Sequence, residues 1–299
     1  MPLFLHIGYP KTSTTYLQNY FFDKLNINFL GKKNNKVWLN SKKRLKFNEI
    51  VNNLKKNKNF LIPDNRTLVS AEGLIGNIWI DDFSNFKALE KILRHKKTKI
   101  IITIRRQTSI FYSIYKQYLW EGGKKSYQEF FRTSFFKNKR EFNINCLNYY
   151  ELFKKLNKRY TKNNFIILPC EMLNKDNFKQ FNKILCKFLD IKEKNLNYHE
   201  KLIRSGYNSN EQFYVRLSNK ILNRKLNTHD NNLENYGILD RILNLRSYFL
   251  KVAKLESFFF KREVEELKKI ENQIYKYFKI SNMRLSKKIK LDLGQFKYY

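Results

Sequence analysis

A short apolar run, a polar turn and an amphipathic stretch open this chain, and together they constrain its fold most. Residues 3–7 suit a buried strand, and after the turn the apolar positions 17, 20 and 21 recur at helical spacing. A strand that enters a tight turn and then a helix collects free backbone N–H groups and the positive end of the helix dipole. We therefore predict a phosphate or sulfate site at this turn. Its charged and hydroxyl residues are Lys11, Thr12, Ser13, Thr14 and Thr15.

The turn lacks a glycine that nucleoside triphosphatases require. Their phosphate-binding loop has a glycine directly before its lysine, whereas here Pro10 precedes Lys11 and Gly8 is the only glycine nearby. The sequence therefore disfavours nucleoside triphosphate hydrolysis. For the same reason, a small-molecule kinase is only the third hypothesis for this chain.

A second strand is predicted to end in positive charge. Residues 99–104 are mainly β-branched and apolar, which is typical of a strand buried on both faces. Arg105 and Arg106 follow, and apolar residues at helical spacing come after them in residues 110–118. A guanidinium group binds phosphate oxygens in bidentate fashion and stays charged. Taken alone, however, an arginine after a strand is most often a solvated surface charge.

The two segments together resemble the sulfotransferases that use 3′-phosphoadenylyl sulfate (PAPS). In that family Lys-Ser/Thr-Gly-Thr-Thr follows the first strand, and Ser13 stands where the family usually has glycine. The family's 3′-phosphate motif is an arginine at a strand's end and a serine eight positions later, often with a tyrosine two further on. Arg105, Ser113 and Tyr115 meet that spacing, and Gln107 after the arginine doublet looks like the bacterial branch.

The resemblance implies a role for each of these residues. Lys11 would meet the charge of the leaving 5′-phosphate, and the hydroxyl residues 12–15 would supply further donors. Arg105 and Ser113 would hold the 3′-phosphate. Residues 165–173, which include Glu171, look like the family's later strand, and Arg204 begins a turn where related proteins place a cofactor-side loop. The scheme requires PAPS as sulfuryl donor and no metal.

The general base is predicted from its position. Cytosolic family members use a histidine, and several glycan-modifying members use a glutamate. Glu72 follows the apolar residues of a predicted strand and precedes Gly73, so apolar neighbours can raise its pKa toward neutrality. The alternative for Glu72 is an ion pair with a nearby lysine or arginine. His6, within the first strand, is expected to orient the loop.

The order of elements predicts an α/β fold, a doubly wound and mainly parallel sheet flanked by helices. Strands are expected at residues 3–8, 27–30, 67–72, 98–104 and 164–169. Helices are expected at residues 14–23, 41–57, 83–94, 108–120, 126–136, 146–160 and 176–189. Residues 211–299 are expected to be mostly helical. We predict a single sulfotransferase-like domain over residues 1–299, with its core in residues 1–210.

Composition bears on location and partners. The 60 Lys and Arg against 26 Asp and Glu give a net charge of +34, which attracts polyanions. The alternative is a compositional bias of the coding sequence toward Lys, Asn, Ile and Phe, which would produce the same charge. No nucleic-acid-binding motif joins it, so nucleic acid is a disfavoured partner. The sequence shows no signal peptide or membrane span, and its three cysteines fit a reducing compartment, so we predict a cytoplasmic protein.

Two functional hypotheses rank above a kinase. The favoured one is a PAPS-dependent sulfotransferase that acts on a hydroxyl, most plausibly of a carbohydrate or cell-surface precursor. An anionic glycan is one such acceptor. The alternative is a non-catalytic protein of the same fold that uses its charge to hold nucleic acid or an acidic glycan.

Overall fold

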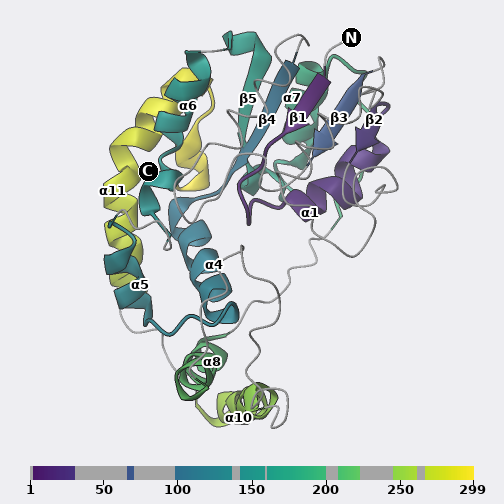
Figure 1. Ribbon diagram of the computed structural model, residues 1–299. Coiled ribbons are helices and arrows are strands. Elements are labelled where there is room, and N and C mark those ends of the chain that lie inside the picture. Colours follow the sequence, from purple (N-terminus) through teal and green to yellow (C-terminus); the bar gives the residue numbers. More distant parts are fainter. Residues whose placement is uncertain are drawn as a thin grey trace, which may run out of the picture. The chain divides into compact units, whose positions relative to one another are not determined.

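Five parallel strands form one sheet in the described part of the chain (Figure 1). The computed structural model describes residues 3–30, 66–70, 98–136, 142–158, 160–199, 208–222, 245–260 and 267–299. The sheet has the order β2-β3-β1-β4-β5, and each neighbouring pair is parallel. Its strands are β1 (Leu3–His6), β2 (Asn28–Leu30), β3 (Thr67–Ser70), β4 (Thr98–Ile104) and β5 (Phe165–Pro169).

The central strands are buried because their residues are apolar on both faces. Every residue of β1 is buried, and so are the last five residues of β4. In the register of the sheet, Leu5 lies between Val69 of β3 and Ile100 of β4. Continuous apolar runs of this kind are typical of parallel strands covered by helices on both sides.

The strand order reverses between β1 and β4. The chain leaves β1 toward β3 and β2 on one side, and it leaves β4 toward β5 on the other. In open α/β sheets, ligands bind beyond the carboxyl ends of the strands at such a switch point. Both predicted anion-binding segments begin there, directly after His6 and after Ile104.

The segment after β1 is helical but irregular. The sequence predicted a helix at residues 14–23, and the structure has three short pieces: α1 (Thr14–Tyr16), the π-helix η1 (Leu17–Phe21) and the 3₁₀-helix η2 (Phe22–Lys24). Phe21 packs edge-on against Phe178 and Phe181 of α7 (Phe178–Leu189), with ring centroids 5.9 and 5.5 Å away. Wider turns of the π type are frequent at functional sites.

Further helices surround β5. They are η4 (Ile144–Leu147), α6 (Tyr149–Asn157), η5 (Lys162–Asn164) and η6 (Cys170–Met172). The ring of Phe153 on α6 packs against Phe165 of β5, with centroids 5.6 Å apart. The prediction of a mainly parallel α/β sheet flanked by helices is therefore confirmed, and the predicted helices near residues 41–57 and 83–94 lie outside the described residues.

The chain divides into two compact units. One comprises Met1–Arg106, Asn145–Lys201 and Phe278–Tyr299, and the other comprises Gln107–Ile144 and Leu202–Tyr277. The second unit is helical where described, with α4 (Gln107–Trp120), α5 (Tyr127–Thr133), α8 (Ser209–Ile221) and α10 (Leu245–Phe259). Single-domain organisation with a core at residues 1–210 stays a prediction.

Helices also dominate the C-terminal part, as predicted. The long helix α11 (Leu267–Ile289) is followed by the 3₁₀-helix η8 (Leu293–Phe296). Among the helices that the structure describes, none combines the length and the apolar character that crossing a membrane requires.

Candidate active site

Gly8 allows the chain to turn tightly after β1. A Cβ atom built on Gly8 would lie 2.9 Å from Thr14 Oγ1, 3.0 Å from Thr103 Oγ1 and 3.2 Å from His6 Cε1. These distances are shorter than van der Waals contact, so a larger residue would push the hydroxyl groups apart. The glycine therefore brings the loop close to the end of β4.

Two residues of the loop adopt left-handed backbone conformations. Lys11 has a φ of 66°, and Ser13 has a φ of 64°. For residues other than glycine this conformation costs about 1–2 kcal/mol each. Ser13 occupies the position where the motif of the PAPS-dependent sulfotransferases usually has glycine. Its backbone nevertheless has the left-handed conformation that glycine adopts most easily. Strain of this kind concentrates at functional sites.

The side chains of the loop divide into buried and exposed groups. Lys11 and Thr15 are exposed, Ser13 is half-buried, and Thr12 and Thr14 are buried. Thr14 Oγ1 is buried and has no hydrogen-bond partner among the residues that the structure describes. Since buried polar atoms almost always have a partner, an unpartnered hydroxyl here fits a ligand oxygen or a water molecule.

A chain of buried hydrogen bonds connects three strands to the loop. His6 Nδ1 lies 2.7 Å from Ser70 Oγ of β3, and His6 Nε2 lies 3.1 Å from Thr103 Oγ1 of β4. Thr103 Oγ1 lies 2.9 Å from Thr12 Oγ1, which donates to the Tyr9 carbonyl at 2.6 Å. Through these contacts the position of Thr12 depends on His6, the residue that the sequence expected to orient the loop.

The donor and the acceptor of each hydrogen bond in this network can be assigned. Because Thr12 donates to a carbonyl, Thr103 must donate to Thr12, and His6 Nε2–H must donate to Thr103. His6 Nδ1 then accepts from Ser70, whose oxygen accepts from Gln18 Nε2 at 3.0 Å. Burial lowers the pKa of His6 to about 3, so the imidazole is neutral as this arrangement requires.

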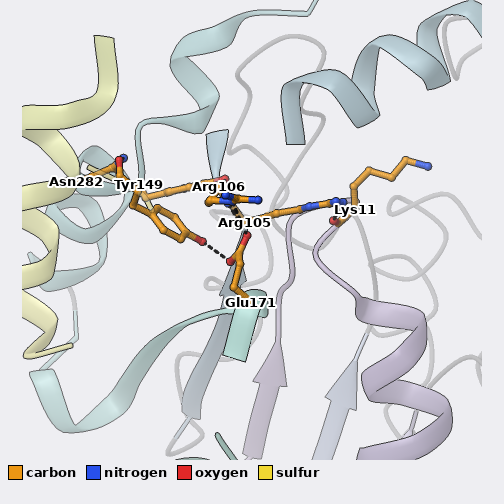
Figure 2. Close-up of polar contacts among 7 residues, drawn as sticks. Lys11, Arg105, Arg106, Tyr149, Glu171 and Asn282 are labelled. Carbon is orange, nitrogen blue, oxygen red and sulfur yellow. Dashed lines mark hydrogen bonds and ion pairs between the residues drawn. The ribbon is translucent and has the colours of Figure 1, made fainter. Parts of the chain in front are cut away.

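Arg105 joins the second segment to the first. It follows β4, and its Nη1 donates to the carbonyl oxygen of Lys11 at 3.1 Å, across 94 positions of sequence. Figure 2 shows the Arg105 side chain extending toward the backbone of Lys11, whose own side chain extends away from it. The structure therefore brings together the two segments that the sequence identified separately.

Two side chains to which the sequence assigned no role form hydrogen bonds with the backbone of Arg105 and Arg106. They are Tyr149 and Glu171, and Glu171 in turn accepts a hydrogen bond from Tyr298. Glu171 lies in η6, two residues after β5 ends at Pro169, and it therefore carried a signal, because functional groups gather at strand ends. Tyr149 and Tyr298 lie far from Arg105 in sequence, and no local pattern marks them.

The remaining predicted residues are placed less completely. Ser113 lies half-buried on α4 in the second unit. Tyr115, also on α4, is buried and donates to the Lys125 carbonyl at 3.3 Å, and burial raises its pKa. Glu72 and Arg204 lie outside the described residues. Within the described ranges, no group of three His, Cys, Asp or Glu side chains could hold a metal ion.

Comparisons with known proteins point to one family. Residues 2–233 match the model of the sulfotransferase domain. A comparison with curated protein sequences found no match.

Solved structures with a similar arrangement include two sulfotransferases. The mouse sulfotransferase SULT7A1 complexed with PAP is 16% identical over 65% of this chain, with a TM-score of 0.42, and the chain spans 60% of that structure. The sulfotransferase from Alicyclobacillus acidocaldarius is 12% identical over 76% of this chain and 97% of its own, with a TM-score of 0.44. These similarities are remote. The match to the domain model covers well over half of the residues, and on that ground the chain belongs to the sulfotransferase family.

Proposed function

We propose that this protein transfers a sulfuryl group from PAPS to an acceptor hydroxyl. Membership of the sulfotransferase family supports the reaction class. The observation that carries the proposal is the hydrogen bond from Arg105 to the Lys11 carbonyl, because it joins two cationic segments at the switch point of the sheet. PAPS carries a sulfated 5′-phosphate and a 3′-phosphate, and a nucleotide of this kind would contact both cationic segments.

The residues of the loop fit the donor. The unpartnered hydroxyl of Thr14 and the exposed ammonium of Lys11 suit a sulfated phosphate, and Thr12, Ser13 and Thr15 add backbone or hydroxyl donors. Arg105 would hold the 3′-phosphate together with Ser113, and Arg204 would contact the cofactor. PAPS, when bound, supplies the sulfuryl group and a good leaving group.

The chain's own residues would supply positioning, charge and a base. Lys11 can neutralise the charge that develops on the leaving phosphate, and Arg105 fixes the register of the nucleotide. We propose Glu72 as the group that removes the proton of the acceptor hydroxyl. His6 cannot serve as the base, because it is fully buried and both of its ring nitrogens are hydrogen-bonded within the protein.

The class of acceptor is proposed from the net charge of the chain. A net charge of +34 favours an anionic substrate, so we propose a carbohydrate or other cell-surface precursor that carries acidic groups. Cys146, Cys170 and Cys186 are buried and form no disulfide with one another, and we propose a cytoplasmic location, which cell fractionation can test. The net charge of +34 also favours the alternative function, polyanion binding without catalysis.

Nucleotide binding tests the proposal. Adenosine 3′,5′-bisphosphate should raise the melting temperature more than adenosine 5′-monophosphate at equal concentration, because only the former reaches both cationic segments. Arg105→Ala should remove this difference, since it removes the charge proposed to meet the 3′-phosphate. Arg66→Ala is the matched control, because Arg66 pairs with Asp190 at 3.0 Å and should leave the difference intact.

Two results would decide against the proposal. Equal shifts for both nucleotides would remove the case for a 3′-phosphate site. If PAPS and candidate glycans yield no sulfated product by mass spectrometry while polyanions bind tightly, the chain is a polyanion-binding protein instead.

A further inference from the structure

The peptide unit between Arg105 and Arg106 is held at both of its polar atoms. The Tyr149 hydroxyl donates to the Arg105 carbonyl oxygen at 2.7 Å, and the Arg106 N–H donates to Glu171 Oε1 at 2.9 Å. A peptide unit is planar, so these two hydrogen bonds together fix its orientation. We call these two hydrogen bonds, with Tyr149 and Glu171, the clamp; it acts on the peptide unit directly after β4, which ends at Ile104.

A second hydrogen bond orients the carboxylate of Glu171. Tyr298 donates its hydroxyl hydrogen to Glu171 Oε2 at 2.9 Å, so each carboxylate oxygen has its own donor. Tyr298 is 2% exposed. Burial, reinforced by the nearby Glu171 charge, raises the pKa of Tyr298 well above its usual value, so the phenol keeps the proton that it donates.

The segment that carries Tyr298 is itself anchored. Asn282 of α11, fully buried, donates its side-chain amide to the Tyr298 carbonyl at 2.8 Å. The Tyr298 N–H donates to the Leu293 carbonyl at 3.2 Å. Because both backbone groups of Tyr298 are held, its phenol reaches Glu171 from a fixed point.

Tyr149 is anchored in a similar way. It is fully buried, and its ring packs edge-on against Tyr9 of the loop after β1, with centroids 5.2 Å apart. The Tyr9 hydroxyl donates to the Cys146 carbonyl at 2.9 Å. Tyr149 and Glu171, the two residues that hydrogen-bond the Arg105–Arg106 peptide unit, are therefore both held in place by further contacts.

We propose that Tyr298, acting through Glu171, is a positioning residue that directs the Arg105 side chain toward the 3′-phosphate of the nucleotide. Arg105 begins at the clamped peptide unit and ends at the Lys11 carbonyl, so a rotation of that unit would swing its guanidinium group away from the loop. Residues 292–299 thus contribute to nucleotide specificity although Tyr298 need not contact the ligand. This inference rests on the proposed function.

A pair of tyrosine substitutions tests the inference. Tyr298→Phe removes only the hydroxyl that orients Glu171. Tyr299→Phe is the matched control, because the Tyr299 hydroxyl bonds Asp292 at 3.0 Å and Ser286 at 3.1 Å and does not reach the clamp. Calorimetry with adenosine 3′,5′-bisphosphate and with adenosine 5′-monophosphate gives two dissociation constants for each variant. Tyr298→Phe should weaken the bisphosphate about three- to tenfold and leave the monophosphate nearly unchanged, whereas Tyr299→Phe should preserve their ratio.

The same substitution in an Arg105→Ala background separates positioning from stability. If Tyr298 acts through Arg105, Tyr298→Phe should have no further effect on the ratio once the arginine is gone. If the role of Tyr298 is purely structural, Tyr298→Phe should lower the melting temperature and weaken the binding of both nucleotides equally. That result would overturn the inference. If the wild-type protein itself does not prefer the bisphosphate, the proposed function fails, and this inference fails with it.

Discussion

At the scale of single residues, Ser13 shows how the loop keeps its shape without glycine. Its φ of 64° and ψ of 26° are left-handed, and its side chain makes no capping hydrogen bond to the helix that follows. The surrounding contacts, including the hydrogen bond from the Leu17 N–H to the Ser13 carbonyl at 3.0 Å, hold it in this conformation. The strain is stored in the loop that is proposed to bind the sulfated phosphate.

Replacing this serine by glycine should therefore stabilise the fold. Ser13→Gly relieves the left-handed strain but adds disorder to the unfolded chain, and we expect a net gain of about 0.5–1 kcal/mol in the free energy of unfolding. Chemical denaturation measures the change. Thr15→Gly is the control, because Thr15 is helical and exposed and its replacement should lower stability. A loss of stability in Ser13→Gly would contradict the strain argument.

Also at this scale, Lys11 and Glu72 should matter for turnover more than for binding. Lys11→Ala should lower kcat by about a hundredfold if its ammonium mainly meets charge that develops on the leaving oxygen. Glu72→Gln keeps the size of the side chain but not the base, and kcat should fall roughly a hundredfold. The nucleotide dissociation constant should stay near the wild-type value in both.

Sulfate transfer to a glycan acceptor, followed by mass spectrometry, gives these rates. Lys24→Ala is a suitable control, because Lys24 lies at the end of the helical segment and contacts His199 at 2.7 Å instead of the loop. Wild-type rates in both variants would show that the assigned roles are wrong.

At the scale of elements, the carboxyl ends of three adjacent strands share one hydrogen-bond network. Ser70 of β3, His6 of β1 and Thr103 of β4 are all buried and successively bonded, and the last of them holds Thr12. Leaving one member of a buried network unpaired costs about 1–3 kcal/mol. The network therefore ties the position of the loop to the strand register.

This network predicts a pH dependence of stability. The folded pKa of His6 is about 3, below the usual value of 6.5, so between these values the unfolded chain binds more protons than the folded one. Stability from this group is complete above pH 6.5 and is lost as the pH falls toward 3, with a slope of up to about 1.4 kcal/mol per pH unit.

Denaturation at several pH values between 5 and 7 measures this slope. His6→Gln should remove the part of it that the histidine causes. Ser70→Ala is the control, because it lowers stability but keeps the imidazole and hence the slope. Equal slopes in the wild type and His6→Gln would refute the assignment of a neutral, buried histidine.

At the scale of the whole molecule, the unit that contains the sheet is assembled from three separate stretches of the chain. It includes Phe278–Tyr299, which lie far from the sheet in sequence and supply Tyr298. The net charge of +34 acts on the same scale, because its field concentrates anionic ligands around the protein whatever the local geometry.

The strands and the two cationic segments could be predicted from the sequence. Apolar runs such as residues 3–7 and 99–104 become strands because apolar side chains, one of them aromatic in the first and most of them β-branched in the second, pack well on a buried sheet, and charged turns follow them. The tertiary structure alone decided the strand order, the contact between Arg105 and Lys11, the unpartnered hydroxyl of Thr14 and the clamp formed by Tyr149, Glu171 and Tyr298. These features arise from contacts between residues far apart in sequence, and periodicity and propensity report only on near neighbours.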